Sequence, residues 1–293
     1  MFGIHKKQKK DRLDLSQLLE GLRKNEIAVT LKKARKDGSP CRSKFGGQPA
    51  LPTDFAWPRF EAANYDGETA NRPLSFLCQI NLTEMAPLDR DGLLPKKGLL
   101  SFFYEMESSC WGFDPADEGC VRVFCFEDTD ALTPTALPED LAEEHAVMEY
   151  DLSFEAKDSY PSYEELARHA DVDVDWDDYD EALEELGYEL DSERHKLLGY
   201  ANLVQGEMLT ECERSARGLY SGDAKSYRET PDDLKEEIRR AASDWVLLFQ
   251  MASIMDEDYE LMYGDMGDLY FYIRKQDLAE GNFDRVWFAL QCG

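Results

Sequence analysis

The chain has 293 residues, of which 43% are hydrophobic and 12% aromatic, and its formal net charge is −28. A chain of this length and apolar content can bury a stable core without disulfides or metal, and it is not disordered overall. No run approaches the roughly eighteen apolar residues of a transmembrane helix, and the basic start leads into LDLSQ rather than an apolar signal core. Seven cysteines without framework spacing favour reduced thiols in a cytoplasmic protein.

The charge is unevenly distributed along the chain. Residues 1–44 carry thirteen Lys and Arg against five Asp and Glu, whereas residues 127–194 carry three against twenty-five, a net of −22. Such a field repels nucleic acid and acidic membranes and attracts basic partners. The alternative is that the acidic segment is only a solvated, solubilising face.

In chain order, the first predicted element is a helix over about 13–24, where leucines recur on one face. A strand follows at about 27–31, where apolar and polar residues alternate. Residues 37–60 are rich in Gly and Pro but contain anchoring aromatic groups, so we expect an ordered loop. The next predicted elements are strands at about 74–82, 98–104 and 120–127.

In the middle of the chain we expect a strand near 146–154 and two acidic helices, one opening at Pro161 and one over Trp176–Leu186. A further helix is predicted over 231–242, with Thr230 as its N-cap and Pro231 at its first position. The remaining predicted elements are strands near 245–252, 259–263, 268–273 and 285–291 and a short helix at 275–280.

The two ends of the chain resemble each other. KFGG, LSFLCQI, GLLSFFYE and VRVFCFE occur early, and KLLG, WVLLFQM, GDLYFYI and VWFALQC occur late in the same order. We therefore predict a mainly β (α+β) fold, a duplicated antiparallel β-rich module with peripheral helices and an acidic helical insertion. The predicted parts, forming one compact unit, are an N-terminal repeat with a leading helix (1–130), an acidic insertion or bridge (131–194) and a C-terminal repeat (195–293).

A set of short motifs carries a family resemblance. They lie at Ser43, Lys44, Gly46, Gly47 and Pro49, at Trp57 and Pro58, at Gln79, Ile80 and Asn81, and at Gly98, Leu100, Phe102 and Phe103. They continue in HKLLGYANLVQG (195–206), GDMGDLYFYIRKQDL and VWFALQC. Over about 40–126 and 195–292 the chain resembles the YwqG-like family of uncharacterised bacterial proteins, which often has Pro in place of Ala201.

The resemblance implies a mainly antiparallel β fold with peripheral helices, and it implies no activity, since the family is classed as a domain of unknown function. Members of that family have been suggested to act as immunity proteins beside secreted bacterial toxins. For this chain, that suggestion is an expectation about function that the sequence does not test.

Signatures of catalysis and cofactor binding are missing. The chain has no P-loop, GxGxxG, GxSxG or HExxH motif and no paired CxxC, so we predict no cofactor, no catalytic residue and no metal site, and we favour a non-enzymatic role. A calcium loop could be aligned with Asp173, Asp175 and Asp177 at positions 1, 3 and 5 and Glu184 at position 12. Position 6 is Asp178, where the sharp turn of an EF-hand needs glycine.

Polar residues inside apolar strands are the best candidates for a binding site. Gln79 and Gln250 hold equivalent places in the two similar runs, and a buried amide needs hydrogen-bond partners. Each glutamine either tethers a neighbouring loop or lines a cleft between the halves. Lys44 beside two glycines could form an anion-binding turn, and a lone His195 is either a hydrogen-bonding group of the fold or part of a site. The full set of candidates is Lys44, Gly46, Gly47, Trp57, Gln79, Asn81, His195, Gln205 and Gln250.

Two functional hypotheses follow. The leading one is a protein-binding module that docks a basic partner through its acidic segment and neutralises a toxin. The competing one is a small-molecule site, enzymatic or not, between the two repeats, built from Lys44, Gln79, Gln250 and His195. The sequence predicts no nucleic acid or membrane as a partner, and it leaves the oligomeric state open.

Overall fold

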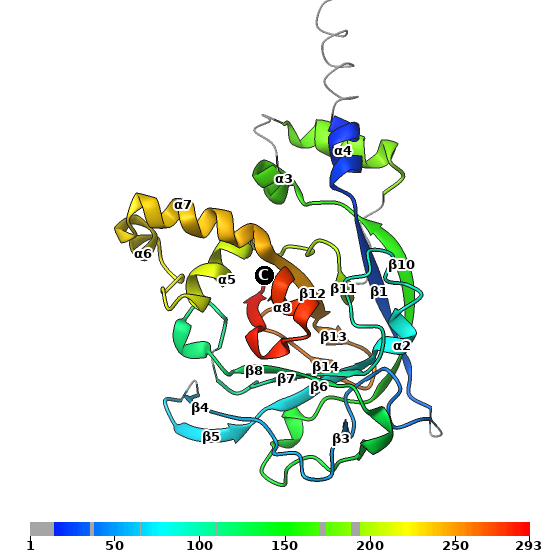
Figure 1. Cartoon of the computed structure of the whole chain (residues 1–293). Coiled ribbons are helices and arrows are strands. Elements are labelled where there is room, and N and C mark those ends of the chain that lie inside the picture. The colour runs from blue at the N-terminus through cyan, green and yellow to red at the C-terminus, as the bar shows by residue number, and fades with distance from the viewer. Residues whose placement is uncertain (1–14, 36–37, 65, 109, 170–173, 189–193) are drawn as a thin grey trace, which may run out of the picture.

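The computed structural model describes residues 15–35, 38–64, 66–108, 110–169, 174–188 and 194–293. Within them, ten antiparallel strands form one strongly curved sheet that nearly closes into a barrel (Figure 1). These strands are β1 (Lys24–Lys33), β2 (Lys44–Phe45), β6 (Ser75–Asn81), β7 (Leu99–Tyr104), β8 (Val121–Phe126), β10 (Tyr150–Ser159), β11 (Lys196–Leu198), β12 (Trp245–Ala252), β15 (Asp268–Arg274) and β16 (Trp287–Gln291). The prediction of a β-rich antiparallel fold with helices is confirmed.

The sheet is arranged evenly about its two longest strands. Strands β1 and β10 pair along ten residues in the middle. On one side of them lie β2, β6, β7 and β8, the N-terminal half-sheet, and on the other lie β11, β12, β15 and β16, the C-terminal half-sheet. Lys44 pairs with Gln79 in the first half-sheet as Lys196 pairs with Gln250 in the second. The chain therefore builds the same strand order on both sides of the central pair.

Strand β12 illustrates why these sequences form buried strands. All eight of its residues are buried, and their side chains alternate between the two faces of the sheet except at a register shift, where Leu248 and Phe249 both face the interior. Val246 and Leu248 enter the interior of the near-barrel, whereas Trp245 and Leu247 pack outward under a layer of helices. A strand covered on both faces reads as one continuous apolar run, which is why WVLLFQM shows no polar alternation.

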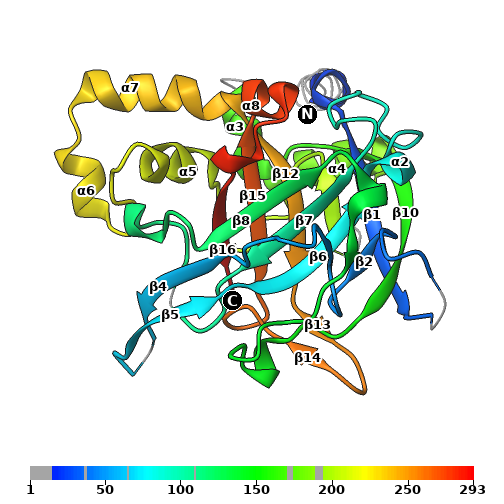
Figure 2. The same ribbon diagram turned by 60° about the horizontal axis from the view of Figure 1, so that its bottom comes forward.

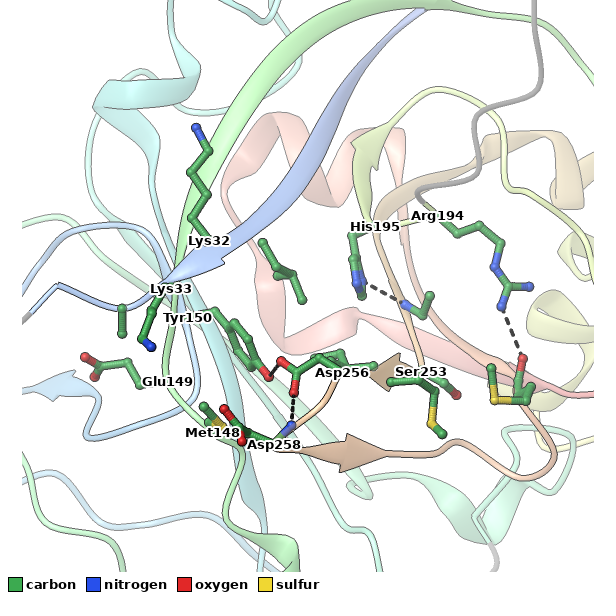
Figure 3. A pocket seen from close by; sticks show the side chains of 16 residues that line it. Lys32, Lys33, Met148, Glu149, Tyr150, Arg194, His195, Ser253, Asp256 and Asp258 are labelled. Atoms are coloured by element: carbon green, nitrogen blue, oxygen red, sulfur yellow. Dashed lines mark hydrogen bonds between the residues drawn. The ribbon is translucent and has the colours of Figure 1, made fainter.

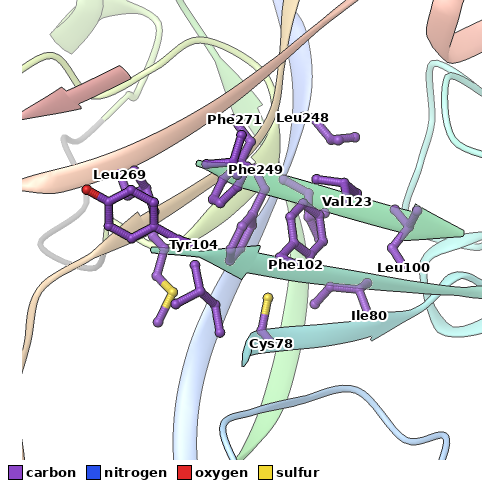
Figure 4. Close-up of a cluster of buried hydrophobic side chains, with 14 of the residues drawn as sticks. Cys78, Ile80, Leu100, Phe102, Tyr104, Val123, Leu248, Phe249, Leu269 and Phe271 are labelled. Atoms are coloured by element: carbon purple, nitrogen blue, oxygen red, sulfur yellow. The ribbon is translucent and has the colours of Figure 1, made fainter. Parts of the chain in front are cut away.

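The interior of the curved sheet is one core shared by both half-sheets (Figure 4). The ring of Phe102 lies 4.9 Å from that of Phe249 and 5.2 Å from that of Phe271, measured between centroids. Each such buried side chain contributes about 2 kcal/mol to the stability of the fold, because its apolar surface is removed from contact with water. Much of the stability of each half-sheet therefore depends on side chains from the other.

The open edges of the sheet, β8 and β16, are bridged by the segment that connects β7 to β8. We call its described part, residues 105–108 and 110–120, the seam loop. The amide of Leu290 in β16 donates to the carbonyl of Trp111 (3.0 Å), and the Trp287 indole donates to Gly112 (2.9 Å). In the view of Figure 2, β8 crosses the C-terminal strands β15 and β16 near this closure. The seam loop thus covers part of the β16 edge, which would otherwise expose unpaired backbone groups.

Helices cover the outside in two groups. The helix over residues 15–22 packs with α3 (Tyr163–His169) and α4 (Trp176–Glu185) at one end of the sheet, as Figure 1 shows. The other group is α5 (Leu209–Ala216), α6 (Ala224–Glu229) and α7 (Asp232–Ala241), and α5 contributes Cys212 to the outer face of the C-terminal half-sheet. Two short helices complete the set, α2 (Leu82–Met85) and α8 (Lys275–Glu280). No helix in these described ranges is long and apolar enough to cross a membrane.

The smaller elements lie in the connections. Short strands pair as β3 (Ala50–Leu51) with β9 (Thr133–Pro134), β4 (Arg59–Ala63) with β5 (Thr69–Pro73), and β13 (Ile254–Met255) with β14 (Glu260–Leu261). Single 3-10 turns are η1 (Pro115–Asp117), η2 (Thr129–Ala131), η3 (Glu143–His145), η4 (Ala242–Asp244) and η5 (Phe283–Arg285).

Several local predictions need correction. Thr230 does not cap α7: it follows α6, and its hydroxyl donates back to the Ser226 carbonyl (2.8 Å), while Pro231 precedes α7. The β4–β5 hairpin and helices α5 and α6 have no counterpart among the predicted elements. Three of the four buried residues of α5 are polar, α6 buries none of its residues, and the hairpin buries only Pro73, so apolar residues do not mark these elements.

The acidic segment, residues 127–194, does not form one separate unit outside the sheet. Strand β10 belongs to it, yet β10 pairs with β1 in the centre of the sheet. Helices α3 and α4, in contrast, lie outside the sheet with the first helix. The acidity of residues 127–194 is therefore shared between a central strand and a peripheral helical group.

Candidate functional site

A pocket of about 690 Å³ opens where the central strands meet the C-terminal half-sheet (Figure 3). It is lined by the end of β1, the start of β10, the segment that leaves β12 for β13, and the two residues before β11. These segments are far apart in sequence and meet because β11 and β10 both pair with β1.

His195 is a deeply buried titratable group of this pocket, with 7% of its surface exposed. Its Nδ1 accepts a hydrogen bond from the Ala252 amide (3.0 Å), so the proton of the neutral ring is assigned to Nε2. Burial, with a smaller contribution from Arg194, lowers the pKa of His195 to about 4. In the described part of the chain Nε2 has no hydrogen-bond partner. The pocket therefore offers one neutral N–H donor.

Arg194 lies at the edge of the pocket and is held by a buried carboxylate. Its Nη2 donates to the Met266 carbonyl (3.2 Å) and lies 3.1 Å from Oδ1 of Asp268. The other oxygen of Asp268 accepts from Nε2 of Gln250 (2.6 Å). Burial raises the pKa of Asp268 to about 6, and Arg194 opposes that rise. The guanidinium is thus fixed in place rather than free to follow a ligand.

Tyr150 connects the central strand to the β13–β14 hairpin at the pocket. Its hydroxyl donates to a carboxylate oxygen of Asp256, whose other oxygen accepts the amides of Asp258 and Tyr259 (2.8 Å each). The bond from Tyr150 is the largest cause that lowers the pKa of Asp256. This carboxylate is therefore an acceptor used to hold the hairpin, with little capacity left for a ligand.

Exposed methionines surround the pocket mouth. Met148, Met255 and Met266 line it and are 39%, 51% and 45% exposed. Methionine side chains are flexible and polarizable, so they adapt to apolar ligands of varied shape. On a protein with 32% charged residues, three such side chains at one opening are a distinctive apolar surface.

Gln79 and Gln250 both tether loops. Oε1 of Gln79 accepts the Ala50 amide (2.9 Å), and its Nε2 donates to the carbonyls of Pro40 and Arg42. Oε1 of Gln250 accepts the Asn202 amide (3.0 Å). Neither side chain lines the pocket, and all of these partners belong to the chain itself.

Lys44 and its glycines do not form an anion-binding turn. Nζ of Lys44 donates to Glu149 Oε2 (2.6 Å) and to the Gln48 carbonyl (2.7 Å). The amides of Gly46 and Gly47 donate to carbonyl oxygens of neighbouring segments. The donors that would bind an anion are thus already used, because this turn packs tightly against the start of β10.

The remaining predicted candidates also lie away from the pocket. The Trp57 indole donates to the Leu74 carbonyl (2.8 Å), Asn81 caps α2 by accepting from Thr83 (3.0 Å), and the Gln205 side chain is exposed. Of the nine candidates, His195 lines the pocket. The other pocket residues were not among the predicted candidates. The sequence pointed to one of them only indirectly, since Arg194 is next to the candidate His195.

The aligned calcium loop does not form. Asp175 is the N-cap of α4 and accepts from the Asp177 amide (2.9 Å), and the chain is helical from there through Glu185. Asp177 and Glu184 are therefore about 10 Å apart along one helix, at 1.5 Å per residue, and cannot converge on one ion. Asp173 lies outside the described residues.

Comparison with models of protein families identifies the family of this chain. The family model described as "Domain of unknown function (DUF1963)" matches residues 43–292, which include both half-sheets and every pocket segment except the end of β1. No curated protein matches the chain. Because the match covers most of the sequence, the chain belongs to this family, a domain of unknown function.

Proposed function

We propose that the protein is a non-catalytic binding protein whose pocket at His195 takes a small molecule with an apolar body and a hydrogen-bond acceptor. The observation that carries the proposal is the neutral, buried His195, whose Nε2–H has no partner among the described residues. A ligand acceptor would satisfy this donor, and the methionine rim would cover the apolar body of the ligand.

The lining residues favour binding over catalysis. A histidine with a pKa of about 4 is a poor general base at neutral pH. The Ser253 hydroxyl donates to the Gly267 carbonyl (2.7 Å) and accepts from the Tyr263 amide (3.0 Å), so it is not activated as a nucleophile. The described lining residues therefore contain no nucleophile paired with a base.

Anilinonaphthalene sulfonate is a suitable probe because it joins an aromatic body to an anionic acceptor. We expect saturable fluorescence enhancement with the folded protein, and at least about tenfold weaker binding to Ala34→Trp, which fills the mouth of the pocket. Ala62→Trp in β4, a half-exposed alanine outside the pocket, is the matched control. Equal binding to both variants would sink the proposal.

A second candidate function is docking of a basic protein partner on α4. The helix carries six Asp and Glu and no Lys or Arg, and Trp176 at its start is 53% exposed among them. An exposed tryptophan on a helix that carries six carboxylates suits a cationic segment, through charge attraction and cation–π contact. A cationic toxin neutralised by this protein would be one such partner.

A short poly-lysine peptide tests this surface. We expect salt-sensitive binding that weakens in Trp176→Ala and in the double variant Asp177→Asn/Asp180→Asn. Asp232→Asn/Asp233→Asn at the start of α7 removes the same charge from another exposed helix. If that control weakens binding equally, the attraction comes from net charge alone and α4 is not a docking site.

We also propose that the two half-sheets arose by duplication, within a YwqG-like bacterial lineage and a reducing cytoplasm. The turns Lys44–Gly47 and Lys196–Gly199 both end in two residues of left-handed backbone. Lys44 pairs with Glu149, which immediately precedes β10, and Lys196 pairs with Glu26 of β1. A self-comparison of family sequences in which 44–81 fails to align with 196–252 would argue against duplication.

A further inference from the structure

The seam loop contains a cluster of ligand-type side chains that the proposed pocket does not use. Glu105 follows β7, Cys110 lies within the loop and Cys120 precedes β8. The three residues are 1%, 3% and 0% exposed, and a carboxylate oxygen and both sulfurs all lie within 4.8 Å of one another. These groups converge because Glu105 and Cys120 face each other across the hairpin, where the Glu105 amide donates to the Cys120 carbonyl (2.9 Å).

We propose that Glu105, Cys110 and Cys120 bind a Zn²⁺ ion that pins the seam loop across the closure of the near-barrel. Ligand atoms around one tetrahedral Zn²⁺ lie about 3.3 to 3.8 Å apart, so small side-chain rotations would bring these three groups into range. Two sulfurs with one carboxylate select zinc over magnesium or calcium, which prefer oxygen ligands. The site is independent of the proposed ligand pocket.

The surroundings of the cluster are already shaped for this role. The Glu105 carboxylate accepts the Ser108 amide (2.7 Å) and the Glu107 amide (3.3 Å), which orient it and leave lone pairs for a metal. The Ser108 hydroxyl is buried on the same turn and has no partner within the described ranges. It offers a further oxygen donor to complete four-coordination.

The position of the cluster explains what the ion would do. Cys110 immediately precedes Trp111 and Gly112, whose carbonyls receive the hydrogen bonds from β16. The carbonyl of Cys110 itself accepts from the Tyr104 hydroxyl (2.7 Å). An ion joining Cys110 to the ends of β7 and β8 would therefore hold the segment that is hydrogen-bonded to the edge strand β16. Metal binding of this kind adds directly to folding stability.

Cobalt binding by the reduced, chelator-treated full chain tests the site. We expect one equivalent of Co²⁺, with the visible bands of tetrahedral cobalt and a near-ultraviolet thiolate-to-cobalt band, displaced by Zn²⁺. Cys110→Ser and Cys120→Ser should each lose the thiolate band, and Glu105→Gln should weaken binding. Cys212→Ser is the matched control, a cysteine 1% exposed in a different cluster.

A folded, reduced wild-type chain without the thiolate band overturns the proposal, as does a band that persists in both cysteine variants. A Cys110–Cys120 disulfide, with no metal uptake after its reduction, also overturns it. Should the cysteine variants fail to fold, the wild type alone decides: Zn²⁺ should raise the thermal midpoint of the chelated protein, and no rise refutes the site.

Discussion

At the scale of single residues, this protein places titratable groups where burial controls their protonation. His195 is held neutral beside the pocket, and Asp268 is buried next to Arg194 with its pKa raised to about 6. Both side chains are fixed by hydrogen bonds to the chain itself. Their titration therefore reports on the folded state and connects the stability of the protein to pH.

His195 should make the protein less stable in mild acid. Its pKa falls from 6.5 in an unfolded chain to about 4, so below pH 6.5 the unfolded state takes up the proton first. The resulting contribution, about 3 kcal/mol, is present above pH 6.5 and lost as the pH falls to 4. His195→Asn keeps an acceptor for the Ala252 amide and removes the titration. In urea unfolding from pH 7 to 4, the difference between the two proteins should shrink; a constant difference contradicts the assignment.

Gly112 should tolerate no side chain. Its φ is +87°, and a Cβ there would lie 2.1 Å from the Phe288 carbonyl oxygen, where the seam loop meets β16. Gly187 also has a positive φ (+69°) but nothing within 4 Å. We expect Gly112→Ala to lower the free energy of unfolding by at least about 2 kcal/mol more than Gly187→Ala does. At Gly187 the added methyl group meets no neighbour, so only the left-handed backbone conformation is unfavourable. Equal losses in chemical denaturation would show that the seam is loosely packed.

At the scale of elements, ion pairs made by buried lysines attach the short strands β2 and β11 to the residue that precedes β10 and to β1. Nζ of Lys196 donates to Glu26 Oε2 (2.8 Å), and the two side chains are 4% and 6% exposed. Lys44 and Glu149 make the corresponding contact for β2. Strands of two or three residues have few ladder hydrogen bonds, so these pairs fix where each half-sheet joins the centre.

Breaking one such pair should be costly. Lys196→Met leaves Glu26 buried without its counter-charge, and we expect a loss of about 3 to 5 kcal/mol in the free energy of unfolding. Adding Glu26→Leu removes the stranded charge and should recover much of that loss. Lys235→Met, which breaks a solvent-exposed pair with Asp232, should have no measurable effect. A double variant no better than Lys196→Met would contradict this account.

At the scale of the whole molecule, the two half-sheets are joined by a single interior. Phe102 comes from one half-sheet and Phe249 and Phe271 from the other, and their rings pack directly together. The central pair β1–β10 and the seam loop connect the halves at two further places. This arrangement favours cooperative unfolding of the near-barrel as one unit.

Phe102→Ala should therefore weaken both halves. We expect a loss of about 3 to 5 kcal/mol from the lost burial and the cavity, seen as one shifted unfolding transition. Hydrogen exchange should rise in β12 and β15 as much as in β6 and β7. Unchanged protection of β12 and β15, or two separate transitions, would mean that the half-sheets are energetically independent.

The sequence predicted most sheet strands within one or two residues, and α8 with the bounds observed, because each is marked by a local apolar pattern and turn residues. It predicted less of the connections. Helices α5 and α6 are not marked by apolar residues, since three of the four buried residues of α5 are polar and α6 buries none. Thr230 was predicted as the N-cap of α7 but is the C-cap of α6, because the two helices follow each other directly in the chain. Of the predicted candidates His195 lines the pocket, whereas Lys44, Gln79 and Gln250 bind neighbouring loops.

By itself, then, the sequence determined the class of fold and the positions of its main strands. These follow from interactions between near neighbours along the chain, which a one-dimensional pattern records. Only the tertiary structure decided that β10 lies at the centre, that His195 meets Met148 and Met255 around a pocket, and that Glu105, Cys110 and Cys120 converge at the seam. Those groupings depend on how distant strands pair and how far the sheet curls, and spacing along the chain carries no record of either.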